Sequence, residues 1–231
     1  MIDPERLRTA LSEAEARIAD AAQRSGRRPG DVEIVLAGKY VPADQAPALA
    51  AAGVRVIGEN RMQDLEAKHA VLGDRVTFDF IGHLQRRKVR RVLPLVRLIH
   101  SVDSVDLVRE IAARSGGPVR FLVQVNTSDE PTKGGIAPDD LAAFAAAAAE
   151  IPDAVIGGLM TLPPRSVRAE DARPYFASLR ELRDRFAAEW AGRHDFRDLS
   201  MGTSQDFWVA VEEGATRVRI GRAMIDLAQV S

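Results

Sequence analysis

The segment Glu33-Ile-Val-Leu-Ala-Gly-Lys39 decides how the rest of this chain is interpreted. Its aliphatic run is typical of a buried parallel strand. Lys39 stands where that strand should finish, and lysine is almost never buried without a partner. A desolvated lysine loses its proton more easily and can form a Schiff base, so Lys39 is a candidate nucleophile. A lysine that simply reaches solvent from the strand end is the alternative.

Similar apolar segments recur along the chain and alternate with helical patterns. We expect strands at 33–38, 55–58, 78–82, 98–102, 119–126, 154–160, 197–200 and 216–220. We expect helices at 43–52, 60–72, 85–93, 104–115, 138–150, 170–191 and 204–213, with a further helix at about 4–25. Eight strands with seven intervening helices predict an α/β fold, a single (β/α)8 TIM barrel whose first and last strands pair. A doubly wound open sheet is the structural alternative.

Length and composition narrow the possible classes of protein. The 231 residues predict one domain over 1–231, with an N-terminal helix within 1–25 and the barrel over 33–221. The net charge of −1 gives no bulk field that favours nucleic acid or an anionic membrane. The absence of cysteine excludes disulfides, thiolate chemistry and zinc sites built on Cys. No segment resembles a membrane span or a signal peptide. We therefore expect a cytoplasmic monomer that binds neither membrane nor nucleic acid.

The basic run 86–91 is the one segment that suggests nucleic acid. Val89, Val92 and Leu93 recur within and after it at helical spacing, which indicates that one face of this segment is buried. No aromatic residue interleaves the arginines for base stacking. The run is therefore interpreted as the solvated side of an outer helix.

Polar residues and glycines gather where the expected strands end. In a barrel the loops after the strands form one face, and active sites are built there. Lys39 follows the first strand, Asn60 the second, and Ser200-Met-Gly-Thr-Ser204 the seventh, while Arg219-Ile-Gly221 ends the eighth. Pairing of the last strand with the first would bring the final two segments close to Lys39.

The segment 200–204 has the character of a phosphate site. It leads into an expected helix, whose free amide hydrogens and dipole suit an anion. Gly202 allows close approach, the hydroxyls of Thr203 and Ser204 can donate, and Gly221 offers another backbone donor. An ordinary helix N-cap by Ser204 is the alternative. Arg219 alternates with apolar neighbours and points either into the barrel mouth or into an ion pair.

Together these segments resemble the pyridoxal phosphate homeostasis family, short single-domain relatives of the N-terminal domain of alanine racemase (fold type III). The matching stretches are Leu36–Pro42, Ile57–Asn60 with Gln63, Phe80–Gln85 with Lys88, Ile99–Asp103, Val125–Asn126, Lys133–Ile136, Gly158–Met160, Leu199–Gly202 and Val218–Gly221. The resemblance implies a barrel that holds pyridoxal 5′-phosphate (PLP) as a Schiff base on Lys39. It also implies that Asn60 lines the ring pocket and that Arg219 faces the pyridine nitrogen. Ser200, Gly202, Thr203 and Gly221 would surround the phosphate.

The resemblance further implies a cytoplasmic cofactor carrier or regulator of vitamin B6 and amino-acid pools, without robust catalysis. Its partners would include PLP-dependent apoenzymes. Three positions depart from the family pattern. Gly38 stands where serine or threonine is usual, Thr203 replaces a methionine, and Arg222 replaces a small hydroxylic residue. Arg222 would either strengthen phosphate binding or occlude the site.

Two alternative functions remain open. The chain could be a PLP-dependent enzyme, such as a weak racemase or decarboxylase, or a PLP-free barrel that uses Lys39 as an aldolase-type lysine. An arginine facing the ring nitrogen cannot give up its proton, which weakens the ring as an electron sink. Racemisation also needs a second acid–base group, and strand alternation should turn Tyr40 away from the barrel mouth.

Three other polar residues near the strand ends have two interpretations each. His83 and His100 are acid–base candidates, although single histidines at such places more often pack or form hydrogen bonds. Lys133 is either a second basic contact or a solvated loop lysine.

Overall fold

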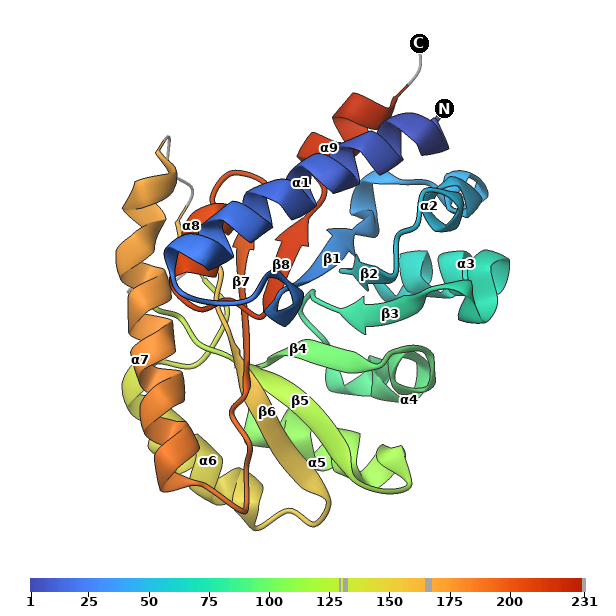
Figure 1. The fold of residues 1–231 in the computed structure, drawn as a ribbon. Coiled ribbons are helices and arrows are strands. Elements are labelled where there is room, and N and C mark those ends of the chain that lie inside the picture. Colours follow the sequence, from blue (N-terminus) through green and yellow to red (C-terminus); the bar gives the residue numbers. More distant parts are fainter. Residues whose placement is uncertain (129, 131–132, 165–167, 230–231) are drawn as a thin grey trace.

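The computed structural model describes residues 1–128, 130, 133–164 and 168–229, and its sheet is a closed barrel of parallel strands in the order β1 to β8 (Figure 1). The strands are β1 (Glu33–Ala37), β2 (Val56–Glu59), β3 (Thr77–Phe80), β4 (Leu98–Val102), β5 (Val119–Gln124), β6 (Ala154–Met160), β7 (Asp198–Thr203) and β8 (Arg217–Ile220). The TIM-barrel prediction is confirmed, and the open-sheet alternative is wrong.

The β1–β8 pairing closes the barrel. Glu33 pairs with Arg217 and Leu36 with Ile220, so the two strands run in register over four residues. All eight strands point the same way, which places every strand's carboxyl end at one mouth. Lys39 and the segments after β7 and β8 therefore lie at the same end of the barrel.

Helices cover the outside of the barrel. They are α1 (Pro4–Arg24), α2 (Pro47–Ala51), α3 (Met62–Leu72), α4 (Val89–Val92), α5 (Val105–Ser115), α6 (Leu141–Ala149), α7 (Arg173–Glu189), α8 (Phe207–Glu212) and α9 (Arg222–Ala228). Several are shorter than the sequence predicted, because 3-10 turns replace their first residues at 43–45, 86–88 and 138–140. Helix α9 was not predicted. No helix in the described ranges is long and apolar enough to cross a bilayer.

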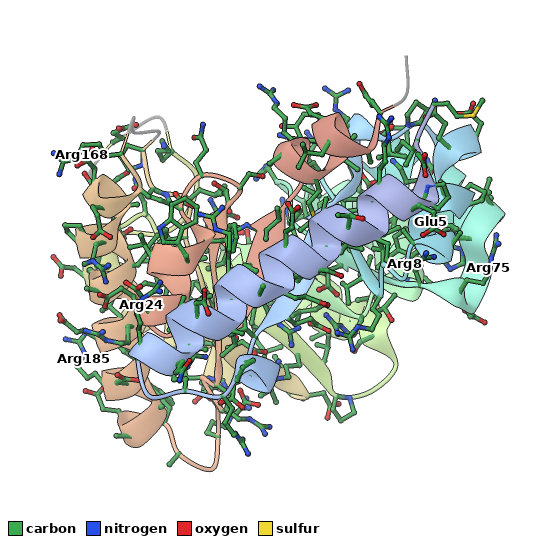
Figure 2. All side chains as sticks on the ribbon, turned by 45° about the horizontal axis from the view of Figure 1, so that its top comes forward. Glu5, Arg8, Arg24, Arg75, Arg168 and Arg185 are labelled. Atoms are coloured by element: carbon green, nitrogen blue, oxygen red, sulfur yellow. The ribbon has the colours of Figure 1, made fainter. Side chains whose placement is uncertain are left out.

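Helix α1 runs diagonally across α8 and beside α9 (Figure 1). Asp3 caps its first turn by accepting hydrogen bonds from the amides of Glu5 and Arg6. The guanidinium of Arg17 lies 3.9 Å from the centroid of the Trp208 ring, which ties α1 to α8. Figure 2 shows charged side chains, including Glu5, along the exposed side of α1.

Charged side chains occupy the barrel at the end opposite the mouth. Arg97 pairs with both Glu33 and Asp79, and Arg217 pairs with Glu33 and Asp198. Arg120 contacts Asp198 as well. These residues lie at or near the first positions of their strands, so the network joins strands from both sides of the barrel. Such contacts hold the strands in register beneath the site.

Candidate functional site

Lys39 lies just beyond the end of β1. The strand stops at Ala37, and Gly38–Tyr40 form one turn of 3-10 helix. The side chain of Lys39 is exposed, so the expectation of an amine desolvated by the protein alone is wrong. Because the chain leaves the strand before residue 39, strand alternation no longer governs this turn.

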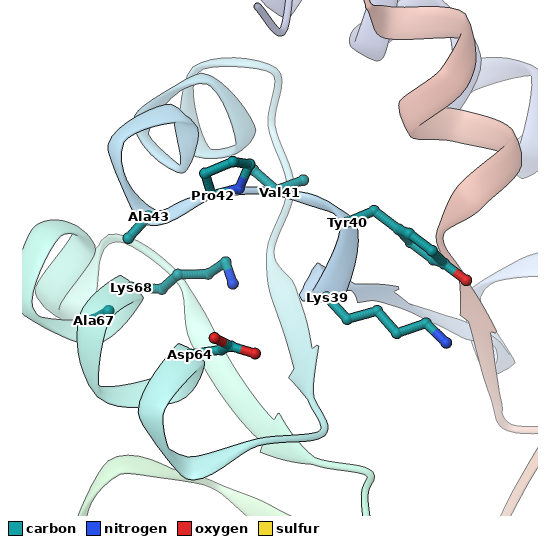
Figure 3. A pocket seen from close by; sticks show the side chains of 8 residues that line it. All are labelled: Lys39, Tyr40, Val41, Pro42, Ala43, Asp64, Ala67 and Lys68. Carbon is teal, nitrogen blue, oxygen red and sulfur yellow. The ribbon is translucent and has the colours of Figure 1, made fainter.

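Tyr40 lies beside Lys39 rather than turned away from it, which corrects the prediction from alternation. Lys39 Nζ lies 4.9 Å from the centroid of the Tyr40 ring, and both side chains point to the same side of the turn (Figure 3). The guanidinium of Arg222 lies 5.2 Å from the same ring. Burial raises the pKa of Tyr40, but hydrogen bonds and charge from Lys39 and Arg222 outweigh it and lower the pKa overall. Arg222 therefore contributes a second cation beside Lys39.

A buried ion pair lies behind this turn. Lys68 Nζ is 2.7 Å from Glu59 Oε1, and both side chains are buried. Burial raises the pKa of Glu59, and the charge and hydrogen bond of Lys68 only partly oppose that shift. A cavity of about 220 Å³ between this pair and the turn is lined by Lys39, Tyr40, Val41, Pro42, Ala43, Asp64, Ala67 and Lys68. In Figure 3 the amine of Lys39 points away from Lys68.

Asn60 follows β2 and presents an unsatisfied polar atom. Its Oδ1 is inaccessible to solvent and has no hydrogen-bond partner among the described residues. Buried carbonyl oxygens are nearly always paired in folded proteins. Gly82 packs closely against Asn60, since a Cβ atom at residue 82 would lie 2.4 Å from the Asn60 carbonyl oxygen. The backbone at this strand end is therefore held tightly in place.

The segment after β7 is a tight loop. Gly202 has φ of +90°, and a Cβ atom there would lie 2.6 Å from Ala210 Cβ. Asp206, rather than Ser204, occupies the N-cap position of α8, and its carboxylate accepts hydrogen bonds from the amide and hydroxyl of Thr203. The ordinary N-cap interpretation of Ser204 is therefore wrong. Helix α8 has only six residues, so its dipole contributes little to anion binding.

Ser204 and Gly221 bring the last two loops together. The Gly221 amide donates to Ser204 Oγ at 3.3 Å. A Cβ atom at residue 221 would lie 2.8 Å from Ala37 Cβ and 3.3 Å from Tyr40 Cδ2. Only glycine allows this approach of the end of β8 to the end of β1. The loops after β7 and β8 consequently adjoin the turn that carries Lys39.

Arg219 points into the barrel. It is 5% exposed, and it donates from Nη1 to Ser200 Oγ at 2.6 Å and from Nη2 to the Thr161 carbonyl at 2.7 Å. Burial lowers the pKa of Arg219 to about 10, against the attraction of Asp206. Within the described part of the chain no carboxylate lies within 4.0 Å of its guanidinium, so the ion-pair alternative is not observed.

The remaining sequence candidates have structural roles. His100 is fully buried in β4 and bonds Ser200 and Asp79, as a hydrogen-bonding histidine should. His83 is largely exposed and lies 3.5 Å from Asp103. Lys133 is not a freely solvated loop lysine, because it donates to the Pro163 carbonyl at 3.1 Å.

Sequence reasoning missed Asp79, Arg97 and Lys68, whereas it placed Thr161 at the ligand-facing end of the sixth strand without foreseeing its contact with Arg219. Asp79 and Arg97 could have been noticed as charged residues within or next to apolar strands. Nothing in the sequence signals the contacts of Lys68 with Glu59 or of Thr161 with Arg219.

These features define a class: a (β/α)8 barrel with a lysine after the first strand, a buried arginine on the last, and glycine-rich loops closing the same mouth. The chain matches the family described as alanine racemase, N-terminal domain, over residues 37–228. It is 41% identical to the pyridoxal phosphate homeostasis protein of Aquifex aeolicus, with 91% of this chain and 93% of that protein covered. The chain therefore belongs to the pyridoxal phosphate homeostasis family, within the broader alanine racemase N-terminal group.

Solved structures agree with this assignment. A crystal structure of an unknown protein from Bifidobacterium adolescentis has a TM-score of 0.87 and 33% identity, with 97% of each chain covered. The structure of PipY from Synechococcus elongatus with PLP bound has a TM-score of 0.77 and 31% identity, with 90% of this chain and 99% of PipY covered.

Proposed function

We propose that this chain binds PLP through Lys39 and acts as a carrier or regulator of the cofactor in vitamin B6 and amino-acid homeostasis. Membership in the pyridoxal phosphate homeostasis family supports this proposal, as does the PLP-bound structure of PipY. The single observation that carries it is the exposed amine of Lys39 at the barrel mouth, next to the loops that Ser204 and Gly221 join.

The residues at the mouth suit the chemistry of PLP. PLP supplies an aldehyde that a lysine amine can capture as a Schiff base. Asn60 Oδ1 lacks a partner, as expected of a group that a bound ring would contact. Close packing at Gly202 and Gly221 holds the loops after β7 and β8 against α8 and the end of β1, so both loops lie beside the turn that carries Lys39. Ser204 would add a hydroxyl group and Arg222 a nearby positive charge, whereas the amide and hydroxyl of Thr203 donate to Asp206 in this structure.

Lys39 is the best placed of the four lysines in the sequence. Lys68 is buried against Glu59, and Lys133 donates to the Pro163 carbonyl. Lys88 follows β3 on the outer 3-10 turn 86–88. Of these amines only that of Lys39 adjoins both the Tyr40–Arg222 pair and the β7 and β8 loops.

A carrier fits these residues better than an enzyme. Arg219 has a pKa of about 10 and so stays protonated near pH 7, which leaves a facing pyridine nitrogen without a proton. Tyr40 is close to Lys39, but both lie on one turn and point to the same side, as Figure 3 shows. They do not offer acid–base groups on opposite faces of a substrate, which racemisation requires.

The decisive experiment is the visible absorption spectrum of purified protein incubated with PLP, followed by borohydride reduction and peptide mass mapping. We expect a yellow band and a reduced adduct on the peptide containing Lys39. Lys39→Met should lose both, whereas the control Lys88→Met should keep them. Retention of the adduct in Lys39→Met would overturn the assignment of Lys39.

Delivery of the cofactor can be tested separately. Loaded protein mixed with a PLP-dependent apoenzyme should restore that enzyme's activity faster than the same total PLP supplied free. Transfer no faster than dissociation into buffer would favour buffering over delivery. Efficient turnover of an amino acid by the loaded protein would instead favour the enzyme alternative.

A further inference from the structure

A continuous chain of polar side chains, buried except for Arg97 at its far end, leads from Arg219 across the inside of the barrel. Arg219 Nη1 lies 2.6 Å from Ser200 Oγ, and Ser200 Oγ lies 2.8 Å from His100 Nδ1. His100 Nε2 lies 3.1 Å from Asp79 Oδ2, which Arg97 Nη2 contacts at 2.7 Å. The five residues come from β8, β7, β4 and β3 and from the residue just before β4. Ser200, His100 and Asp79 are at most 1% exposed.

The direction of each hydrogen bond in this chain follows from its two ends. Arginine has only donors, so Ser200 Oγ must accept from Arg219. The single proton of the Ser200 hydroxyl is then free to go to His100 Nδ1, which must accept it. His100 therefore carries its proton on Nε2 and donates it to the Asp79 carboxylate. In this arrangement each hydrogen bond from Arg219 to Asp79 joins one donor to one acceptor.

A proton added to His100 would disrupt the arrangement. Nδ1 would then donate to Ser200 Oγ, which already accepts from Arg219, and the serine proton would lose its acceptor. The charged groups around His100 are Asp79 on β3 and Arg217 and Arg219 on β8. Burial lowers the pKa of His100, and the two arginines add to that effect, while Asp79 opposes it. The neutral form that the geometry requires is thus the favoured form.

We propose that Ser200 and His100 are positioning residues that hold the buried Arg219 guanidinium in one orientation inside the barrel. Ser200 then acts on a bound cofactor through Arg219 and the ring, not through the phosphate. This inference rests on the proposed function to the extent that Arg219 faces bound PLP. The hydrogen-bond chain itself exists in the protein without ligand.

The first test uses the ligand-free protein. Nitrogen-15 NMR of labelled histidine should show His100 as the neutral tautomer with its proton on Nε2 and an accepting Nδ1. Ser200→Thr keeps the hydroxyl, whereas Ser200→Val has nearly the same shape without it. We expect the hydrogen-bonded Nδ1 signal to persist in Ser200→Thr and to shift in Ser200→Val. A proton on Nδ1 in the wild-type protein would overturn the proposal.

The second test compares PLP with pyridoxal, which lacks the phosphate. Loss of one hydrogen bond to a charged group should weaken binding about tenfold. We expect Ser200→Val to weaken the binding of PLP and of pyridoxal by the same factor and to shift the visible band. Ser200→Thr should bind both ligands as the wild type does and leave the band in place. Weakening of PLP alone would place Ser200 at the phosphate and overturn the proposal. Failure of the wild-type protein to bind either ligand would refute the proposed function, while the NMR result would still decide the hydrogen-bond chain.

A second pair of variants guards against misfolding of the Ser200 variants. His100→Asn retains an acceptor near the place of Nδ1, and His100→Leu has a similar shape without one. His100→Asn should preserve the position of the visible band better than His100→Leu. Equal spectra and equal affinities for these two variants would contradict the positioning role.

Discussion

At position 38, the neighbouring side chain of Glu59 leaves room only for glycine. Its φ is not positive, so backbone conformation does not demand glycine here. Space does: a Cβ atom at residue 38 would lie 2.2 Å from Glu59 Oε1 and 2.8 Å from Ile57 Cγ2. Glu59 cannot easily move aside, because it is buried and paired with Lys68. The family's usual hydroxylic residue is therefore incompatible with this arrangement of Glu59.

We predict that Gly38→Ala destabilises the protein by about 1–3 kcal/mol, the usual cost of overpacking a buried site. Urea unfolding should detect this change. Gly30→Ala is the matched control, because no atom lies within 4 Å of the added Cβ and φ is again not positive. Equal stability of the two variants would contradict this account of Gly38.

The error over Tyr40 has a physical cause at the same scale. An apolar run shows where a strand begins, but not at which residue it yields to a turn. Here the strand ends at Ala37, two residues before Lys39, and the 3-10 turn brings Tyr40 back beside the lysine. Lys39 could be predicted as a site candidate from its position. The contacts of Tyr40 with Lys39 and Arg222 could not be predicted, because they depend on that turn.

At the scale of elements, the loop from β7 to α8 depends on Gly202. Both its φ of +90° and its contact with Ala210 oppose any side chain. Gly192 offers a useful comparison, since it has φ of +87° but no atom within 4 Å of an added Cβ.

We predict that Gly192→Ala costs about 1 kcal/mol through its backbone conformation alone. Gly202→Ala should cost more than this, because steric overlap adds to the same conformational cost. It should also weaken PLP binding, which Gly192→Ala should leave unchanged. Thermal and urea unfolding with a PLP titration would measure both effects; similar losses in the two variants would argue against a packed loop.

Element types were predicted far better than element ends. Periodicity identified all eight strands, but the helices expected at 43–52, 85–93 and 204–213 are shorter in the structure. Helix α9 was missed because its seven residues give only a brief pattern after β8. Its place is set by tertiary contacts, such as the hydrogen bond from the Asp3 amide to the Ala228 carbonyl.

At the scale of the whole molecule, inward-facing polar residues link the strands in a way that no single segment reveals. Asp79, His100, Ser200 and Arg219 are far apart in sequence and meet only because the barrel closes. Alternation identified Arg219 as a candidate inward residue. The partners of Arg219 could not be predicted, because the local sequence does not determine which residues of distant strands lie at the same level of the barrel.

This interior predicts a specific dependence of stability on pH. Burial lowers the pKa of His100 below its ordinary 6.5, so the folded state takes up a proton less readily than the unfolded state. The free energy of unfolding should therefore fall as the pH drops below about 6.5, by at most about 1.4 kcal/mol per pH unit for one histidine. Burial also lowers the pKa of His194, so this residue likewise reduces stability as the pH falls. The pKa of Glu59 is raised, so protonation of Glu59 favours the folded state at low pH and partly offsets that loss.

Comparison of variants isolates the contribution of His100. Urea unfolding at pH 7.5 and 5.5 should show a smaller loss of stability in His100→Asn than in the wild type. Identical losses would mean that His100 is not held neutral. A separate loss of folding stability should follow below about pH 3.8. Burial alone would raise the pKa values of Asp79 and Asp198, but His100 and Arg97 lower that of Asp79, and Arg217 and Arg120 lower that of Asp198. Protonation of these two carboxylates therefore favours the unfolded state.

The β1–β8 seam has a consequence for the timing of synthesis. Lys39 leaves the ribosome early, whereas Arg219 and Gly221 emerge only after almost the entire barrel has been translated. Chains begin to fold from the N-terminal side as they are made. A nascent chain therefore contains Lys39 long before the barrel mouth is complete, because the mouth is completed only when β8 pairs with β1. If Lys39 and the β7 and β8 loops hold PLP as proposed, loading with cofactor should follow the synthesis of β8.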